Sequence, residues 1–388
     1  MLNILKTKKM RGLIHILKIF LKAKKVFFKP LKKKYLVVDS RNFFLLKNYL
    51  GKKNFNVIHS RGEEINLYVV IYALLNLSFR NLQLSYINAY IKLTKPKCCI
   101  TLNHAKLFFY QIKKYNKNLI TIVFQNGHVF LKYPYSKFLN AIRQENLKFG
   151  KKNLSVDYAF SHNSYFSANL FKKYVKCQTI EVGGFKNNHY FKKKKIKKKK
   201  IITFISQFRL DLWDTEFITK DFYESEKLLL PNLYRFCKKN NFSLEILGSE
   251  WDPKKEINFL KKILKNNDWT FHKRTINNYS YSLTDQSSIV VFIDSNLGWE
   301  SLGRGNKTVS FSLRDGYHAS YYKSGFEFLK KNGNFWTTYF TDVEFNRVMN
   351  YAKNTSLKKW RTDNALLIKQ IMQYDSRNKE FKKILSNI

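Results

Sequence analysis

Short apolar runs alternate with longer amphipathic segments through the first half of the chain. The runs predict strands at Tyr35–Asp39, Asn56–Ser60, Cys98–Thr101, Leu119–Phe124, Asp157–Ser161 and Gln178–Val182. Helical periodicity separates them, at Ile65–Phe79, Leu82–Leu93, Ala105–Lys114 and Tyr165–Val175. Such alternation predicts βα units around a parallel sheet.

A second alternation follows a lysine-rich break. Residues 185–200 break the pattern, and eight of the nine positions 192–200 are lysine, which predicts a solvated connection because such a run repels itself. Strands are then predicted at Ile201–Ile205, Ser243–Leu247, Trp269–His272, Ser288–Ile293 and Lys307–Ser312. Helices are predicted at Tyr223–Asn240, Pro253–Lys265, Ile276–Gln286, Leu297–Gly303, Val343–Ala352 and Thr362–Asp375.

The two alternations predict an α/β fold of two Rossmann-like domains that face each other across a cleft. At 388 residues the chain is too long for one ordinary core. The predicted parts are a basic arm at 1–34, a first domain at 35–184, a linker at 185–200 and a second domain at 201–388 that includes the terminal helices. In open parallel sheets ligands bind beyond the carboxyl ends of the strands, so the residues that follow each strand are the informative ones.

Charge separates the two halves further. Of 72 basic residues 59 are lysine, which A/T-rich codons would favour, yet residues 1–198 hold 41 basic and 6 acidic residues against 31 and 21 in the rest. The first half is therefore expected to face an anionic partner. No helix-turn-helix, RNP or zinc-finger pattern occurs, so a membrane surface is favoured over a nucleic acid.

The first 34 residues carry 12 Lys or Arg and no acid. Apolar positions between Leu13 and Phe28 favour an amphipathic helix in the headgroup region, with a loosely ordered tail as the alternative. Ile65–Phe79 is too short and too broken to span a bilayer, and a buried core helix is expected there. The four cysteines show no CxxC spacing and fit a reducing compartment, so a cytoplasmic protein on the inner face of the membrane is predicted.

The densest polar signal follows the Ser288–Ile293 strand. The segment runs Asp294-Ser295-Asn296-Leu297-Gly298-Trp-Glu300, with Arg304 one turn later. Backbone N–H groups at such a strand-to-helix turn bind anions, and Glu300 is placed to accept two hydrogen bonds from a ribose diol. Arg304 is expected to reach a phosphate or to pair with Glu300. A plainly structural alternative is a capped helix with Glu300 on a solvated face.

This segment resembles the donor-site signature of surface-polysaccharide (O-antigen type) glycosyltransferases with the GT-B architecture. Three further segments are similar to that family in order: Thr121–Gly127, Asp157–Ser161 followed by Val182-Gly183-Gly184, and Ile205-Ser206-Gln207-Phe-Arg209. The resemblance covers roughly residues 55–315. It implies transfer of a sugar from a nucleotide-activated donor to a cell-surface polysaccharide or lipopolysaccharide precursor. His128 departs from the family pattern.

A metal-independent reaction is expected because the sequence has no Asp-x-Asp motif. Backbone amides, Ser206, Ser295 and either Arg209 or Arg304 would then meet the phosphate charge, and no cofactor is needed. An inverting enzyme of this architecture needs a general base on the first domain. Glu63 and Glu64 follow a predicted strand, and His104 follows another, so these three are the candidate catalytic residues, with His128 next.

Two other functions remain open. A polyol-phosphate transferase acting on a CDP-glycerol-type donor would use a histidine on each side of the cleft, for which His128 and His272 are placed. A basic nucleic-acid-binding protein would need exposed aromatic residues between the basic ones, whereas here most aromatics fall within apolar patterns. The Leu-Gly-x-Glu pattern favours a nucleotide-sugar donor over a CDP-glycerol-type donor.

Overall fold

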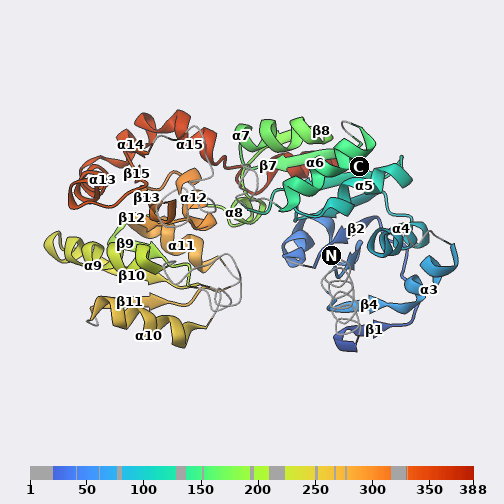
Figure 1. Ribbon diagram of the computed structural model, residues 1–388, viewed down its shortest axis with the longest axis horizontal. Helices are drawn as coiled ribbons and strands as arrows, with labels where there is room; N and C mark the ends of the chain where they lie inside the picture. Colours follow the sequence, from blue (N-terminus) through green and yellow to red (C-terminus); the bar gives the residue numbers. More distant parts are fainter. Residues whose placement is uncertain are drawn as a thin grey trace, which may run out of the picture.

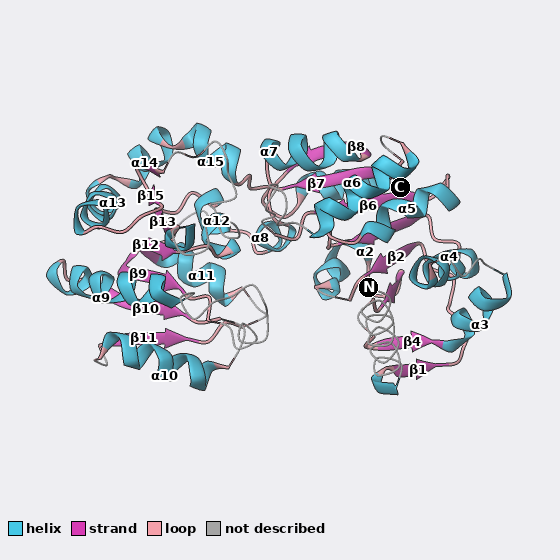
Figure 2. Cartoon of the chain, in the orientation of Figure 1, coloured by secondary structure: helices cyan, strands magenta, loops and turns pink. Residues whose placement is uncertain are grey.

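Two α/β lobes lie side by side, each with its own sheet (Figure 1). The structure, a computed structural model, describes residues 21–40, 42–60, 62–76, 81–127, 137–150, 153–192, 196–208, 223–249, 252–265, 268–275, 278–315, 329 and 331–388. Within these ranges both lobes are doubly wound, with helices flanking the strands (Figure 2). The predicted fold of two Rossmann-like domains is confirmed.

The first lobe is built on a six-stranded parallel sheet with the order β3-β2-β5-β6-β7-β8 among the described residues. Its strands are β2 (Tyr35–Val38), β3 (Phe55–Ile58), β5 (Cys98–Thr101), β6 (Ile120–Phe124), β7 (Ser155–Ser161) and β8 (Lys176–Glu181). Its helices are α2 (Lys47–Leu50), α3 (Leu67–Asn76), α4 (Leu82–Thr94), α5 (Leu107–Tyr115), α6 (Lys137–Phe149), α7 (Ser164–Phe166) and α8 (Phe185–His189). A 3-10 turn precedes α2 and a π-helical turn follows α7.

The second lobe has the order β11-β10-β9-β12-β13-β15-β14, parallel except for the last pair of strands. Its strands are β9 (Lys199–Ile205), β10 (Ser243–Leu247), β11 (Trp269–His272), β12 (Ser287–Phe292), β13 (Thr308–Phe311), β14 (Asn332–Gly333) and β15 (Trp336–Thr337). Its helices are α9 (Glu224–Lys239), α10 (Pro253–Leu264), α11 (Tyr279–Gln286), α12 (Asn296–Gly303), α13 (Asp342–Asn354), α14 (Leu357–Asp363) and α15 (Ala365–Ile371).

Local sequence explains where several helices start. Asp252 accepts hydrogen bonds from the first backbone N–H groups of α10, and Pro253 occupies the first helical position, where it loses no hydrogen bond. Thr341 and Ser356 cap α13 and α14 in the same way. Strand β6 is rich in β-branched residues and buried along most of its length, as expected for a central strand of a parallel sheet.

The end of the chain corrects the predicted domain boundary. After α15 the backbone returns to the first lobe, where Gln373 donates to the carbonyl of His162 and Asp375 to that of Val182. The last helix, α16 (Lys379–Ser386), packs the fully buried Phe381 against Phe124, Phe160 and Phe185. Residues 379–386 therefore belong to the first lobe, because their apolar face completes that lobe's core.

The linker also differs from its prediction. It was expected to be solvated, but the side chains of Lys192 and Lys198 are largely buried against the second lobe. Both ammonium groups donate to the side-chain oxygen of Asn306, at 2.6 and 3.2 Å. Oxygen acceptors of the second lobe offset the free-energy cost of burying these lysines. A run of lysines in the sequence does not show that such acceptors lie nearby. Residues 193–195 lie outside the described residues.

The edge of the first lobe departs from the sequence reading as well. The segment predicted as one buried helix is split into β4 (Glu64–Asn66) and α3, and β4 pairs with β1 (Lys24–Val26), which was assigned to the basic arm. Only one stripe of α3 packs inward, through Val69 and Ala73. Its other face is exposed because the helix lies at the end of a two-stranded sheet with nothing of the described chain over it. The arm's residues 1–20 lie outside the described residues.

Candidate active site between the lobes

The carboxyl ends of the strands from both lobes meet at a narrow pocket. First-lobe residues line most of it, and Glu300 of α12 closes it from the second lobe. The lining residues are Asn42, Leu45, Leu102, Phe124, Gln125, Asn126, Gly184, Phe185, Lys186 and Glu300. Ligands of open parallel sheets bind at this position.

Two glycines allow the lobes to approach each other. A Cβ built on Gly127 would lie 2.7 Å from the side-chain nitrogen of Asn296, and one on Gly184 would lie 2.8 Å from Oε1 of Glu300. Both spacings are shorter than real Cβ contacts, so any side chain there would push α12 residues away. The first turn of α12 therefore faces the strand ends of the first lobe directly.

Glu300 is held in a defined orientation. The hydroxyl of Tyr281 donates to its Oε2 at 2.8 Å, which leaves Oε1 toward Gly184. Burial raises the pKa of the Glu300 carboxyl, while the Tyr281 hydrogen bond opposes that rise. A carboxylate with one oxygen fixed and the other facing a pocket is able to accept hydrogen bonds from a ligand hydroxyl pair.

Cations near Glu300 come from both lobes. The charges of Lys186, in α8, of Arg304 and of Arg274, after β11, all lower the pKa of Glu300. Arg274 also donates to the carbonyl of Ser206 at 3.4 Å, which places its guanidinium over the end of β9. The sequence analysis did not single out Lys186 or Arg274, because one basic residue among 72 does not indicate a binding site.

The turn before α12 lies where it was predicted. Ser295 is buried at the helix start and its carbonyl accepts from Gly298, while Leu297 and Gly298 are buried beneath the turn. A side chain on Gly298 would overlap the Phe292 ring, which lies 2.1 Å from the ideal Cβ position. Asn296 is exposed toward Gly127.

Asp294 is tied into a buried ion network. Its Oδ2 accepts from Nε of Arg314 at 3.0 Å, and the same guanidinium binds Glu226 through two further hydrogen bonds. Arg314 and Glu226 are almost fully buried. Although burial alone would lower it, the charges of Asp294 and Glu226 raise the pKa of Arg314. Asp294 thus anchors the start of the α12 turn.

Arg304 is not where the sequence reading placed it. Its guanidinium pairs with both carboxylate oxygens of Asp285 and lies over the rings of Tyr281 and Tyr374. It does not bond Glu300, and it faces the linker instead of the interlobe pocket. The predicted pairing of Arg304 with Glu300 is wrong, because Asp285 on α11 binds the guanidinium instead. The charge of Arg304 still lowers the pKa of Glu300.

Ser206 and Gln207 follow β9 at the same edge of the second sheet. Ser206 is buried, its N–H donates to the Leu247 carbonyl, and its Oγ accepts from the N–H of Phe208. Nearby, the buried Glu256 binds the N–H and hydroxyl of Ser249, which fixes the loop after β10. Arg209, predicted to meet phosphate, lies outside the described residues.

The three candidate bases have different surroundings. Glu63 is exposed and accepts from the Ser40 hydroxyl at 2.6 Å, beside the end of β2. Glu64 lies within β4, 3.5 Å from the Lys24 ammonium, and not directly before a helix, as the helix predicted from Ile65 implied. Of the two, Glu63 is closer to the sheet edge at which ligands bind.

His104 has the surroundings of a structural group. Its Nδ1 accepts from the backbone N–H of Asn126 at 3.1 Å, and burial lowers the pKa of the ring to about 3. The ring therefore stays neutral with Nδ1 occupied, which argues against a role as the general base. His104 and His162 together fix the Gln125–Gly127 turn. The backbone N–H of His162 donates to the side-chain oxygen of Gln125, and its ring Nε2 contacts the Gln125 carbonyl.

Of the two histidines of the polyol-phosphate alternative, the structure describes His272. His272 lies at the end of β11, 3.0 Å from a Glu245 carboxylate oxygen and 2.6 Å from the Tyr279 hydroxyl. His128 lies outside the described residues. Among the residues that the structure describes, no three His, Cys, Asp or Glu side chains gather where they would hold a metal ion.

Comparison with known proteins gives the family and the fold. Residues 129–388 match the profile of a family described as "putative O-antigen biosynthesis protein". No curated protein sequence matches the chain.

Two solved structures share the whole architecture. A UDP-GlcNAc 2-epimerase from Methanocaldococcus jannaschii, in complex with UDP-GlcNAc and UDP, is 11% identical, with a TM-score of 0.54 over 91% of this chain and 99% of that one. A glycosyltransferase from Rickettsia africae is 14% identical, with a TM-score of 0.50 over 92% and 98%. At these identities the likeness establishes the two-lobed fold.

Proposed function

Because the chain belongs to the O-antigen biosynthesis family, we propose that it is a glycosyltransferase of the GT-B type. It moves a sugar from a nucleotide-activated donor to a precursor of a cell-surface polysaccharide or lipopolysaccharide. The observation that carries the proposal is the position of Glu300, oriented by Tyr281 in the interlobe pocket at the carboxyl ends of both sheets.

In this proposal the second lobe holds the donor. Glu300 accepts hydrogen bonds from the ribose hydroxyls, and the N–H groups of the Ser295–Leu297 turn face the diphosphate. Lys186 and Arg274 supply positive charge beside the ribose-binding carboxylate, since their charges, like that of Arg304, act on Glu300. These groups stabilise the leaving nucleotide without a metal ion as a requirement.

The first lobe presents the acceptor. Glu63 is the proposed general base, because its carboxylate lies beside the end of β2 and is held by Ser40. It would remove the proton of the attacking acceptor hydroxyl as the bond between the sugar and the nucleotide breaks. Glu64 stands as the second candidate and pairs with Lys24 in the present arrangement.

The donor site is tested by replacing Glu300. Glu300→Ala is expected to lose nucleoside-diphosphate binding in calorimetry while the melting temperature is retained. Glu224→Ala is the matched control, since Glu224 pairs with Lys227 on the surface of α9, in the first turn of that helix. Unchanged affinity in the Glu300 variant would refute the donor assignment. Radiolabelled nucleotide sugars set against CDP-glycerol separate sugar transfer from polyol-phosphate transfer.

We further propose that the first lobe works against an anionic membrane surface. Exposed apolar side chains gather at its edge, on the segment before β2, along α3 and at the start of α4: Leu21, Phe27, Phe28, Leu31, Ile71, Leu74, Leu75 and Leu82. Asn66 connects the segment before β2 to helix α3. Its side-chain amide donates to the Phe28 carbonyl, and its side-chain oxygen accepts from the Val69 N–H in the first turn of α3. Helix α3 carries no charged residue.

The surrounding charge suits lipid headgroups. Residues 22–33 contain six lysines and no acid, so apolar side chains insert while lysines meet anionic lipid. Within the described ranges, every helix is too short or too polar to cross a bilayer. Flotation with phosphatidylglycerol vesicles is expected to carry the protein, and Phe28→Ser with Leu75→Ser to abolish this. Leu366→Ser, on α15, is the control; equal flotation of all variants would overturn the proposal.

A further inference from the structure

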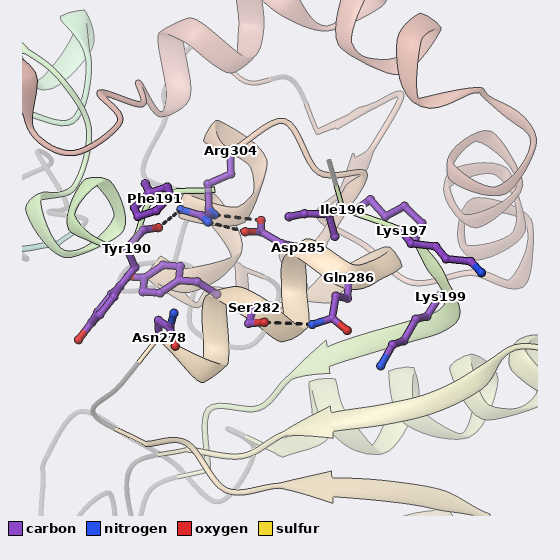
Figure 3. A pocket seen from close by; sticks show the side chains of 12 residues that line it. Tyr190, Phe191, Ile196, Lys197, Lys199, Asn278, Ser282, Asp285, Gln286 and Arg304 are labelled. Carbon is purple, nitrogen blue, oxygen red and sulfur yellow. Dashed lines mark hydrogen bonds and ion pairs between the residues drawn. The ribbon is translucent and has the colours of Figure 1, made fainter. Parts of the chain in front are cut away.

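A second cavity, of about 420 Å³, lies between the linker and helix α11, apart from the interlobe pocket (Figure 3). Its walls combine aromatic rings with basic side chains. They are Tyr190, Phe191, Ile196, Lys197, Lys198, Lys199, Asn278, Tyr281, Ser282, Asp285, Gln286 and Arg304. A cavity of this size accommodates a small organic ligand.

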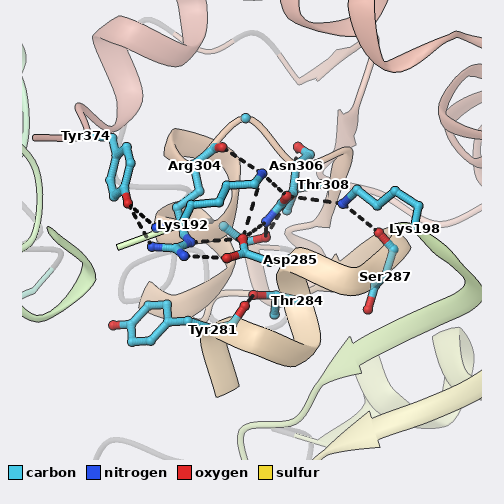
Figure 4. Close-up of polar contacts among 12 residues, drawn as sticks. Lys192, Lys198, Tyr281, Thr284, Asp285, Ser287, Arg304, Asn306, Thr308 and Tyr374 are labelled. Carbon is cyan, nitrogen blue, oxygen red and sulfur yellow. Dashed lines mark hydrogen bonds and ion pairs between the residues drawn. The ribbon is translucent and has the colours of Figure 1, made fainter. Parts of the chain in front are cut away.

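The polar end of the cavity is a cluster of cations around one carboxylate (Figure 4). The carboxylate of Asp285 accepts hydrogen bonds from Nε and Nη2 of Arg304, and its Oδ1 also accepts one from the side-chain amide of Asn306 at 2.9 Å. Lys192 lies 3.8 Å from that carboxylate. Asp285 is therefore fully engaged by groups other than Lys198.

The ammonium group of Lys198 is largely buried, and the acceptors of its hydrogen bonds are uncharged. Its ammonium donates to the Ser287 carbonyl at 2.8 Å and to the Asn306 side chain at 3.2 Å. Among the described residues that line the cavity, Asp285 carries the one carboxylate, against Arg304 and three consecutive lysines. Lys197 and Lys199 are exposed at the rim, while Lys198 and Arg304 lie deeper, and a cavity with this excess of positive charge is stabilised by an anion.

We propose that this cavity is a binding site for a phosphate-bearing small molecule, with the phosphate at Lys198 and Arg304 and the organic part against Tyr190 and Tyr281. The two tyrosine rings lie 5.5 Å apart and give the apolar wall. Phosphate is the class of anion favoured, because the Lys198 ammonium makes two hydrogen bonds among the described residues and has a third donor, beside the positive charge of the Arg304 guanidinium. Nucleoside phosphates and sugar phosphates share this chemistry.

Occupation of the cavity is coupled to the arrangement of the lobes. Arg304 donates to the Tyr190 carbonyl at 2.7 Å and to Asn187, both in the chain that joins the lobes. Tyr281 lines the cavity and donates to Glu300 in the interlobe pocket. A bound phosphate thus holds the linker against the second lobe, next to the residue that orients Glu300.

Proton uptake gives the site a signature. Burial and the neighbouring Lys192 charge lower the pKa of Lys198 to about 7, with Arg361 and Lys307 adding to this and Asp285 opposing it. Burial lowers the pKa of Lys192 to about 8. A bound anion favours the charged lysines, so binding takes up protons and weakens as the pH rises from 7 to 9.

Calorimetry with inorganic pyrophosphate tests the site. Lys198→Met is expected to weaken binding roughly tenfold or more. Gln286→Glu adds a carboxylate to the wall without removing a linker contact and is expected to do the same. Lys239→Gln, exposed at the end of α9, is the control. Titrations in buffers of different ionisation enthalpy measure the proton uptake.

The outcomes separate this site from the donor site. Pyrophosphate binding that survives Glu300→Ala but falls in Gln286→Glu supports the proposal, whatever the donor site does. Binding that is unchanged in both Lys198→Met and Gln286→Glu overturns it. Uridine diphosphate and glucose 1-phosphate, titrated next, distinguish the two sources of the phosphate.

Discussion

The buried network at Arg314 gives the sharpest test of the second lobe. Arg314→Met removes three charge-assisted hydrogen bonds, two to Glu226 and one to Asp294. Methionine fills most of the volume of the arginine's aliphatic chain. The main effect is therefore that the Glu226 carboxylate stays buried without the cation that it binds. Loss of one partner of a buried ion pair costs about 3–5 kcal/mol.

The assay uses the distribution of tryptophan. All six tryptophans lie after residue 200, so urea unfolding followed by tryptophan fluorescence reports on the second lobe alone. Arg314→Met is expected to lower the free energy of unfolding of that lobe by about 3–5 kcal/mol. The double variant Arg314→Met with Glu226→Gln is expected to recover at least about 1 kcal/mol, because a neutral amide is cheaper to bury than a carboxylate.

Two results would refute this reasoning. One is a loss below about 1 kcal/mol in the single variant, which is the range of an exposed ion pair. The other is a double variant no more stable than the single one, since the stranded carboxylate would then not be the source of the cost. Nucleoside-diphosphate affinity is measured in parallel, because Asp294 also anchors the turn that begins α12.

Three further predictions concern other parts of the molecule. Gly184→Ala would place a Cβ 2.8 Å from Oε1 of Glu300, so nucleotide affinity is expected to fall about tenfold or more with little change in melting temperature; an unchanged affinity in calorimetry would mean that the carboxylate does not need its position. Burial lowers the pKa of His162 to about 4 and that of His104 to about 3; the unfolded chain binds these protons near pH 6.5, so stability present above that pH is lost as the pH falls toward 4, and His162→Gln is expected to flatten the acid limb of a stability–pH curve. Phe381→Ala opens a cavity in the aromatic core of the first lobe, and it is expected to lower the free energy of unfolding by about 3–5 kcal/mol. Calorimetry should show a lower melting temperature for the first lobe, whose unfolding does not change tryptophan fluorescence. A shift of the transition seen by tryptophan fluorescence instead would contradict the placement of α16.

The parts of the fold that the sequence predicted are those that depend on local periodicity. Strand β6 and the Gln125–Gly127 turn, and strand β12 with helix α12, were predicted within one or two residues. Each is a buried apolar run that ends at polar or glycine residues, a pattern that needs no knowledge of distant neighbours. The position of Glu300 at the interlobe edge follows from the same rule, because ligand-facing turns follow parallel strands.

The rest depended on partners far away in the chain. Arg304 was expected beside Glu300, but Asp285 lies within reach on the preceding helix and competes for it. Lys192 and Lys198 were expected in water, but Asn306 and backbone carbonyls accept their hydrogen bonds. Helix α3 was expected in the core because its sequence is apolar, and apolarity does not say whether a neighbour covers each face.

The return of the chain to the first lobe bears on how the protein is made. Phe381 completes a core whose other aromatics, Phe124, Phe160 and Phe185, leave the ribosome before the entire second lobe. Until residues 379–386 are synthesised, that patch has no cover, so the first lobe waits for the second although it precedes it in translation. We therefore expect the first lobe to reach its full stability only after residues 379–386 have been synthesised.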